Sequence, residues 1–373
     1  MSSKPASNIP LAKPVFDEEM EAAAVNALRN ERHVMGEDVC KFEEEFARYI
    51  GTKYAVSTSS GTSALQIALL ALGIGKSDEV VTSAYSFIAS GNVVLHAGAT
   101  PVFADINAKT FNVNPEEMKR KITKHTKALL PIHLYGYPCD MDEIMDIAEE
   151  NGLKVVEDAC QAHGAVYAGR KAGAIGGVGC FSFYPSKNMT VCGDGGMITT
   201  NDEGVAKLAG KLRDCGRKSQ YEHDVVGYTS RLNTVNAAIG RIQLKRLDEW
   251  NRKRVHVAAQ YDKLLADVKE VARPPRGDSK TKPVYHLYVI RAKKRDELRE
   301  HLKKKGVATG VHYPLPIPMQ PVYVQMYGFK AGEYPVSEQA SKQCLSLPMY
   351  PFLSKDEVAF VCEGIEEFCH SVK

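Results

Sequence analysis

The sequence predicts an α/β protein built from two units: a larger one with a mostly parallel sheet covered by helices, and a smaller α+β unit at the C-terminal end. Three observations support this prediction. The chain has 373 residues, which is more than a single core usually supports. Strand-like and helix-like segments alternate from about residue 54 to residue 158, as is typical of parallel sheets. A long helical pattern at 234–265 then precedes a segment in which strands and helices mix.

The composition is that of an ordinary folded protein and argues against several classes of function. Lys and Arg number 48 against 45 Asp and Glu, so no charge bias favours a nucleic acid or a membrane as partner. The first residues lack the apolar core of a signal peptide, and no apolar run is long enough to span a membrane. Nine cysteines without a C-x-x-C pair argue against a disulfide framework and a zinc site. We therefore expect no metal and a reducing, cytoplasmic location.

The expected elements of the larger unit follow the chain in order. Residues 1–15, rich in Ser, Pro, Ala and Lys, are predicted to form a loose arm before a helix capped by Asp17. After a second amphipathic helix, a strand at 54–58 turns into a helix at 63–72 that is apolar on nearly every side and should be buried. Further strands are expected at 79–83, 101–104, 127–134, 153–157, 180–183 and 197–200, with helices between most of them.

The smaller unit is expected to follow the long helix at 234–265, which should link the two domains. We place a large domain at 1–245 and a small C-terminal domain at 246–373. The elements expected in the small domain are strands at 285–290 and 307–312, a basic helix at 295–305, a proline-rich loop at 314–318, and a last helix capped by Ser354 and Glu357.

Three chemically different groups are predicted to meet at the carboxyl edge of the sheet, where open α/β sheets bind ligands. Lys187 lies between an apolar strand and a glycine-rich turn at 193–196. A lysine held there can condense with a carbonyl, as in proteins that anchor pyridoxal phosphate, although most loop lysines are only solvated. Gly61 opens a buried helix whose N-terminal N–H groups could bind a phosphate, or it is a plain strand-to-helix turn. Asp158 ends a strand and either joins this site or serves only as a helix cap or a salt-bridge partner.

Several stretches together resemble the sugar aminotransferases of the DegT/DnrJ/EryC1/StrS family, which are fold-type I pyridoxal phosphate enzymes. The similarity runs from about Pro10 to the last helix. It implies a seven-stranded sheet, pyridoxal 5'-phosphate as cofactor with pyridoxamine 5'-phosphate as intermediate, and a homodimer with shared active sites. The stretches are Ser60–Leu65, Val156–Gly164, Phe181–Asn188, Gly193–Gly196, Gly227–Leu232 and Val311–Pro314.

Residue by residue, the resemblance implies that Lys187 forms the Schiff base and shuttles a proton between substrate and cofactor. Asp158 would pair with the protonated pyridine nitrogen, and Gln161 would bond the ring hydroxyl oxygen. Phe87 would stack on the ring, with Tyr85 as a rival for that place. Lysine at 187, where related sugar dehydratases carry histidine, favours transamination over dehydration.

The same resemblance implies where phosphate and substrate bind. Gly61, Thr62 and Ser182 would hold the cofactor phosphate. Thr229 stands where relatives usually supply an asparagine to the phosphate in the partner subunit, so its role in that contact is open. The candidate substrate residues are Tyr184, Arg231, His312 and Tyr313, of which the last two are equally expected to pack beneath the proline-rich loop.

The implied reaction moves an amino group from a donor such as L-glutamate onto a keto group of a nucleotide-linked deoxysugar. Products of this kind serve surface polysaccharide or glycoconjugate biosynthesis. Two alternatives stay open. One is another type I pyridoxal phosphate enzyme, such as a lyase, and the other is a regulatory homologue without catalysis.

Overall fold

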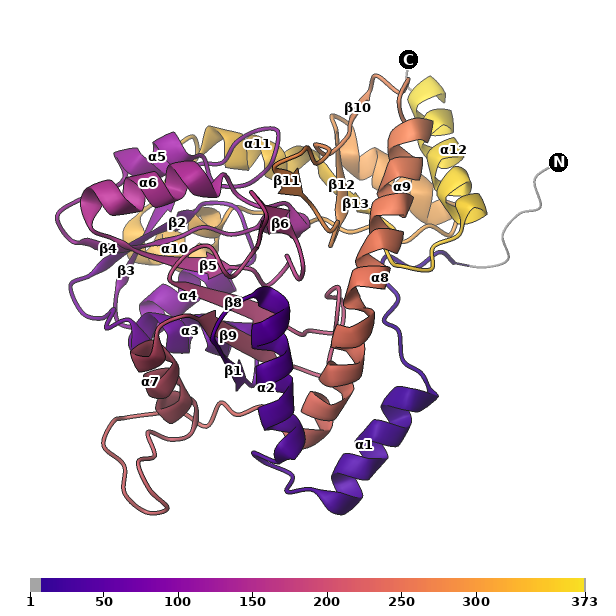
Figure 1. Ribbon diagram of the computed structural model, residues 1–373. Coiled ribbons are helices and arrows are strands. Elements are labelled where there is room, and N and C mark those ends of the chain that lie inside the picture. Colours follow the sequence, from indigo (N-terminus) through magenta and orange to yellow (C-terminus); the bar gives the residue numbers. More distant parts are fainter. Residues whose placement is uncertain (1–7, 372–373) are drawn as a thin grey trace.

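The computed structural model describes residues 8–371 and contains a seven-stranded sheet at the centre of the larger unit (Figure 1). The strand order is β1-β9-β8-β5-β4-β2-β3. Only β9 runs antiparallel to its neighbours, while the other adjacent pairs are parallel. The predicted α/β fold with a mostly parallel sheet is confirmed. The strands are β1 (Tyr54–Thr58), β2 (Glu79–Ser83), β3 (Thr100–Ala104), β4 (Thr126–Leu130), β5 (Lys154–Asp158), β8 (Val178–Ser182) and β9 (Gly196–Thr200).

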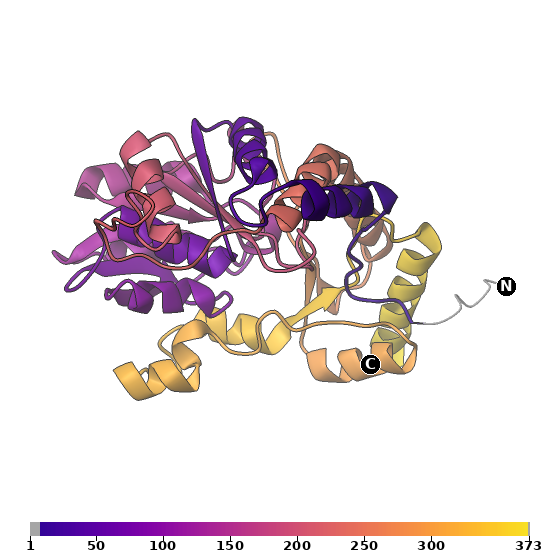
Figure 2. The same cartoon turned by 90° about the horizontal axis from the view of Figure 1, so that it is seen from below.

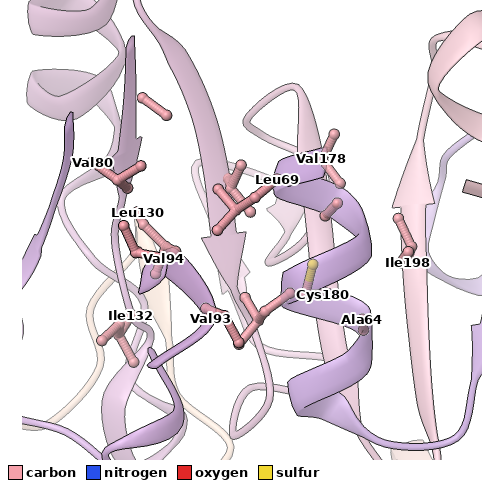
Figure 3. Packing of buried hydrophobic residues seen from close by; sticks show 14 of the residues in the cluster. Ala64, Leu69, Val80, Val93, Val94, Leu130, Ile132, Val178, Cys180 and Ile198 are labelled. Atoms are coloured by element: carbon pink, nitrogen blue, oxygen red, sulfur yellow. The ribbon is translucent and has the colours of Figure 1, made fainter. Parts of the chain in front are cut away.

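Helices cover both faces of this sheet because successive strand side chains point to opposite sides. Val80 and Val156 belong to one core, and their neighbours Val81 and Val155 belong to another. Figure 3 shows the first core, in which helix residues such as Leu69 meet the strands. The first core is covered by α3 (Gly61–Ala71), α4 (Ala89–His96) and α7 (Glu203–Arg213), and the second by α5 (Pro115–Arg120) and α6 (Met141–Asn151).

A third core joins the sheet to the long helix α8 (Thr234–Leu264) and to α2 (Glu37–Ile50). Phe46 of α2 contacts Phe181 and Phe183 edge-on, with ring centroids 5.0 and 5.5 Å apart. The first helix, α1 (Glu18–Asn30), packs on α8 rather than on the sheet (Figure 1). This aromatic core fixes the strand that leads into the loop of Lys187.

The C-terminal part of the chain forms an antiparallel sheet in the order β10-β12-β13. The helices α10 and α11 extend from it along the larger unit (Figure 2). Two-residue strands β6 (Val166–Tyr167), β7 (Arg170–Lys171) and β11 (Thr281–Lys282) make a further small sheet. The elements of the C-terminal part are β10 (Val271–Ala272), β12 (Tyr288–Ala292), β13 (Cys344–Leu347), α9 (Arg295–Lys304), α10 (Pro321–Tyr327), α11 (Pro335–Gln343) and α12 (Lys355–Ser371).

Three local expectations differ from the structure. The segment 307–312 is not a strand, because it makes only isolated bridges, from Val307 to Ile9 and from Gly310 to Ser346. β4 ends at Leu130, before Pro131, which cannot donate a ladder hydrogen bond, so the strand does not continue to 134. β12 begins at Tyr288 rather than at 285, because Tyr285 has a left-handed backbone with φ 45°.

The described part of the predicted N-terminal arm is not loose, whereas residues 1–7 lie outside the described residues. Ile9 is 4% exposed and belongs to the core of the C-terminal part. Its backbone N–H donates to Gly306 O, and its carbonyl accepts from Ala308 N, both at 2.9 Å. The composition of this segment is polar, but one buried isoleucine and its main chain anchor it.

None of the helices between residues 8 and 371 combines the length and the apolar character that crossing a membrane requires.

Candidate active site

A cavity of about 480 Å3 opens at the carboxyl edge of the large sheet, next to the C-terminal part. The parallel strands β1, β5 and β8 all end there, because their carboxyl ends share one edge. The structure therefore brings together groups that lie far apart in the chain. Ten of the predicted site residues line the cavity, namely Gly61, Thr62, Phe87, Asp158, Gln161, Ser182, Tyr184, Lys187, His312 and Tyr313.

Lys187 lies in the loop after β8, with its backbone N–H bonded to Tyr184 O at 2.9 Å. The next residue, Asn188, is buried and donates to Asn251 Oδ1 at 2.8 Å and to Val284 O at 3.1 Å, which fixes the loop. Within residues 8–371, the Lys187 amine has no hydrogen bond or ion pair. Desolvation lowers its pKa, against opposing effects of Cys160 and Asp158. The neutral, nucleophilic amine is thus favoured relative to a free lysine.

Asp158 ends β5 and is 5% exposed. Ser90 Oγ donates to its Oδ2 atom at 2.8 Å, and Cys160 N donates to its Oδ1 atom at 3.1 Å. No described Lys, Arg or His forms an ion pair with it. A buried carboxylate is normally paired with a cation, so Asp158 is suited to a positively charged hydrogen-bond donor of a ligand.

The N-terminus of α3 meets the end of β8 at Gly61. The Ser60 side chain accepts from Ser63 N at 3.0 Å, and Ala64 N makes the first intrahelical bond, to Ser60 O at 3.0 Å. The N–H groups of Gly61 and Thr62 precede that bond and have no acceptor within the helix. A Cβ atom at Gly61 would lie 2.6 Å from Ser182 Cβ. Glycine thus permits a close packing that leaves a helix N-terminus at the cavity, where an anion is favoured.

Gln161 and Tyr313 form one polar wall of the cavity. Gln161 Oε1 accepts from Tyr135 N at 2.8 Å, and its Nε2 atom donates to the Tyr313 hydroxyl at 3.2 Å. The Tyr85 hydroxyl accepts from Tyr313 N at 2.7 Å and donates to Tyr313 O at 2.9 Å. Tyr85 is fully buried and is not part of the cavity lining, so of these two rival rings the one available to a ligand is that of Phe87, which is 53% exposed.

His312 lines the cavity as well, rather than only packing beneath the proline-rich loop. Its Nδ1 atom lies 2.8 Å from Ser346 Oγ of β13. Burial, and then the nearby Lys187, lower the pKa of His312 to about 4. Its imidazole is therefore neutral at neutral pH and can exchange one hydrogen bond with a ligand.

Thr229 and Arg231 are not part of this cavity lining in the same chain. Arg231 Nη1 pairs with Asp214 Oδ1 at 2.6 Å, and Thr229 Oγ1 lies 3.3 Å from Cys215 Sγ. Both residues lie in the segment between α7 and α8. Their predicted contacts with phosphate and substrate would therefore require a second copy of the chain.

Comparison with known proteins assigns the family. Residues 14–366 match the model of the DegT/DnrJ/EryC1/StrS aminotransferase family. The chain belongs to this family. It is 41% identical to the dTDP-3-amino-3,4,6-trideoxy-alpha-D-glucose transaminase of Streptomyces venezuelae, over 95% of this chain and 93% of that protein. It is also 43% identical to a pleiotropic regulatory protein of Geobacillus stearothermophilus, over 91% of this chain and 92% of that protein.

Solved structures of DegT/DnrJ/EryC1/StrS proteins have the same fold. The crystal structure of S. venezuelae DesV in complex with a ketimine intermediate superposes with a TM-score of 0.92, at 41% identity and 94% coverage of both chains. A putative sugar aminotransferase from Streptococcus pneumoniae, in its PLP-form, superposes with a TM-score of 0.93 at 28% identity, over 98% of this chain. The expected family and fold are thereby confirmed.

The cavity of this family member fits pyridoxal phosphate. The N-terminus of α3 and Ser182 suit the phosphate, the carboxylate of Asp158 suits a protonated ring nitrogen, and the unpaired amine of Lys187 suits the aldehyde. The second N–H of Gln161 Nε2 can be donated to a ring oxygen. Each group that the cofactor would need has a matching partner in one cavity.

Several residues that line the cavity escaped sequence reasoning, among them Leu11, Ser90 and His286. Ser90 gave no signal because its partner Asp158 lies on another element. His286 is 5% exposed, and burial, followed by Lys187 and Arg254, lowers its pKa well below the usual value. Leu11 belonged to a segment whose composition predicted no fixed position. A histidine directly before an apolar strand was the only signal available for His286.

Proposed function

We propose that this chain is a pyridoxal phosphate-dependent aminotransferase that transfers an amino group from L-glutamate to the keto group of a nucleotide-linked deoxysugar. Its product would serve surface polysaccharide or glycoconjugate biosynthesis. The observation that supports this most is that the Lys187 amine and the buried Asp158 carboxylate line one cavity, and that neither forms an ion pair within residues 8–371. The names of related transaminases acting on dTDP- and UDP-linked sugars support the substrate class.

The residues of the cavity have distinct tasks in this proposal. When bound, pyridoxal phosphate would supply an electron sink for negative charge at the substrate carbon. Asp158, oriented by Ser90 and Cys160 N, would keep the ring nitrogen protonated. The Lys187 amine, once released from the cofactor, would take the proton from the donor carbon and return one on the acceptor side. Phe87 would cover one face of the ring, and the first turn of α3 would fix the phosphate.

Substrate recognition is proposed for residues at the mouth of the cavity. Tyr184 is 53% exposed there, and His312 and Tyr313 present a neutral imidazole and a phenol. These groups can exchange hydrogen bonds with sugar hydroxyls without placing a net charge beside the ring.

We further propose a homodimer in the cytoplasm. The support for the dimer is that Thr229 and Arg231 lie outside the cavity of their own chain. Their predicted contacts with phosphate and substrate would therefore be made in the cavity of the partner subunit. The exposed Tyr221 and Val226, at 86% and 90%, lie on the same segment between α7 and α8. None of the nine cysteines forms a disulfide with another residue of 8–371, which fits a reducing compartment.

A regulatory role without catalysis is the second candidate, because one relative carries the name of a pleiotropic regulatory protein. Against it stands the cavity itself. A pure binder has no need for both a lysine whose neutral form is favoured and a carboxylate reserved for a cationic ring nitrogen. A lyase reaction would use the same cofactor contacts and can be distinguished from transamination only by its products.

The experiment is a pair of half-reactions followed by visible absorbance. Purified protein loaded with pyridoxal phosphate should lose its visible band on adding L-glutamate and regain it on adding a nucleotide-linked keto-sugar. Borohydride reduction before glutamate should leave the cofactor attached to the peptide that contains Lys187. Lys187→Ala should show neither effect, whereas Lys41→Ala, which removes an exposed lysine on α2, should behave as wild type. Unchanged absorbance with every common amino donor would favour the regulatory role, and 2-oxo acid formation without amine transfer would favour a lyase.

A further inference from the structure

The start of the described chain is built into the C-terminal part and reaches the cavity from there. Ile9 pairs with Gly306 and Ala308 through its main chain, and its side chain is buried in the C-terminal core. Two residues later, the carbonyl of Leu11 accepts a hydrogen bond from Met349 N at 3.0 Å. Figure 2 shows this N-terminal segment running from α1 toward the C-terminal part. The anchors are main-chain groups and Ile9, so the Leu11 side chain itself is not needed to hold the segment.

The Leu11 side chain lies at the rim of the cavity, beside His312. A Cβ atom on Gly310 would be 2.8 Å from Leu11 Cδ2 and 2.6 Å from His312 Cε1. The absence of a side chain at Gly310 therefore lets Leu11 and His312 approach each other. Leu11 and Ala12 both line the cavity. An apolar leucine thus stands directly next to a residue proposed to bind the sugar.

The walls near Leu11 are otherwise suited to polar groups. His312 and Tyr313 can form hydrogen bonds with sugar hydroxyls, while the side chains of Leu11 and Ala12 offer none. A hydroxyl group held against the Leu11 side chain would lose its water and gain no hydrogen bond from that side chain, which is unfavourable. A methyl group in the same place would bury apolar surface, which is favourable. In a keto-hexose without an acetamido group, the largest apolar substituent is the methyl group at C5 of a 6-deoxysugar.

We propose that Leu11 is a specificity-determining residue that contacts the C5 methyl group of a 6-deoxyhexose and disfavours sugars with a hydroxymethyl or carboxylate there. This inference rests on the proposed function and narrows its substrate class. An apolar wall rejects an added hydroxyl only by roughly 10- to 100-fold in kcat/KM. The expected preference is therefore measurable and not absolute.

The test compares two nucleotide-linked keto-hexoses that differ only in a methyl or a hydroxymethyl group at C5. Wild type should prefer the methyl sugar by roughly 10- to 100-fold in kcat/KM. Leu11→Ala should reduce this preference to about threefold or less, mainly by slowing the methyl sugar, because the apolar contact is gone. Leu11→Asn should speed the hydroxymethyl sugar, because the amide can bond the hydroxyl. The matched control is Leu264→Ala on α8, a leucine that is 40% exposed and outside the cavity lining, which should keep the wild-type preference.

Two further measurements separate this inference from the proposed function. The glutamate half-reaction should occur in all four proteins, because none of the substitutions changes Lys187 or Asp158. Calorimetric binding of the same two sugars, reduced at the keto group so that no reaction occurs, should show the same preference and its loss in Leu11→Ala. If wild type transfers amine to both sugars but Leu11→Ala keeps the preference, the role of Leu11 is overturned and the aminotransferase function stands. If glutamate reacts with none of the proteins and neither sugar is aminated, both the role of Leu11 and the proposed aminotransferase function are overturned.

Discussion

Ser90 Oγ, on the first turn of α4, donates a hydrogen bond of 2.8 Å to Asp158 Oδ2, and both residues are buried. The hydroxyl has no other bond partner within residues 8–371. The hydrogen bond from Ser90 therefore fixes Oδ2 of a carboxylate that lines the cavity, while Oδ1 accepts from Cys160 N. This contact joins α4 to the end of β5 across the sheet edge.

Ser90→Ala should weaken the binding of pyridoxal phosphate to the apo protein by about tenfold. A hydrogen bond to a charged group contributes roughly 1.5–3 kcal/mol, and water in the cavity should restore part of that. The dissociation constant is measured by absorbance titration, with Ser279→Ala in the exposed turn before β11 as control. Unchanged affinity of Ser90→Ala would mean that Asp158 does not depend on this bond.

Gly61→Ala should impair cofactor binding more strongly, by about 10- to 100-fold. The added Cβ would lie 2.6 Å from Ser182 Cβ and 2.9 Å from Cys160 Sγ, so the N-terminus of α3 has to move away from β8. Gly210→Ala offers a matched control within α7, because nothing lies within 4 Å of its Cβ position. That variant should bind the cofactor normally and gain about 0.5–1 kcal/mol of stability. Equal cofactor affinity in the two variants would contradict the predicted close packing.

Glu157→Gln should destabilise the fold without altering the site directly. Glu157 points away from Asp158 and accepts hydrogen bonds from His133 Nε2 and from the N–H groups of Gly173, Ile175 and Gly176. An amide in place of the carboxylate would turn an N–H group toward these donors. We expect a loss of roughly 3–5 kcal/mol at pH 7 in urea unfolding. Glu150→Gln, which breaks the exposed pair with Lys119, should cost less than about 1 kcal/mol.

The same pair of proteins tests the pH dependence. Burial raises the pKa of Glu157, but His133 and the backbone N–H groups of Gly173 and Gly176 lower it below its usual value of 4.5 overall. A carboxyl group with a lowered pKa in the folded state stabilises the fold above its unfolded pKa, and this stabilisation is lost as the pH falls through the folded value. The difference between wild type and Glu157→Gln should therefore shrink below about pH 4.5. A difference that is constant from pH 7 to pH 3 would contradict the lowered pKa.

Lys187 should react with pyridoxal phosphate at a lower pH than a free lysine would. Desolvation lowers its pKa from the usual 10.5, while Cys160 and Asp158 oppose the change. Because only the neutral amine attacks an aldehyde, the rate should rise with pH and level off below pH 10.5. The rate of appearance of visible absorbance in apo protein measures this, and Lys187→Ala reports the background from other lysines. An inflection at or above 10.5 would rule out a lowered pKa.

Much of the fold could be predicted because its signals are local. The helix cap at Asp17 follows from the capping preference of this side chain, which accepts a hydrogen bond from Met20 N in the first helical turn. The carboxyl ends of parallel strands share one edge of a sheet, and for this reason the sequence predicts that Gly61, Asp158 and Lys187 lie close together. The prediction of a strand at 307–312 was wrong, because this segment makes only single backbone bridges, to Ile9 and to Ser346, and no continuous ladder of hydrogen bonds.

The α/β class, the position of the sheet edge and the chemical groups at it can be predicted from the sequence, because they depend on periodicity, helix caps and strand direction. The neighbours that complete the site depend instead on how the folded chain packs. Ser90 at Asp158, Tyr85 buried behind Tyr313, and Leu11 beside Gly310 are contacts between distant segments. Such contacts depend on how side chains of separate elements fill a shared space, and no local pattern in the chain encodes that.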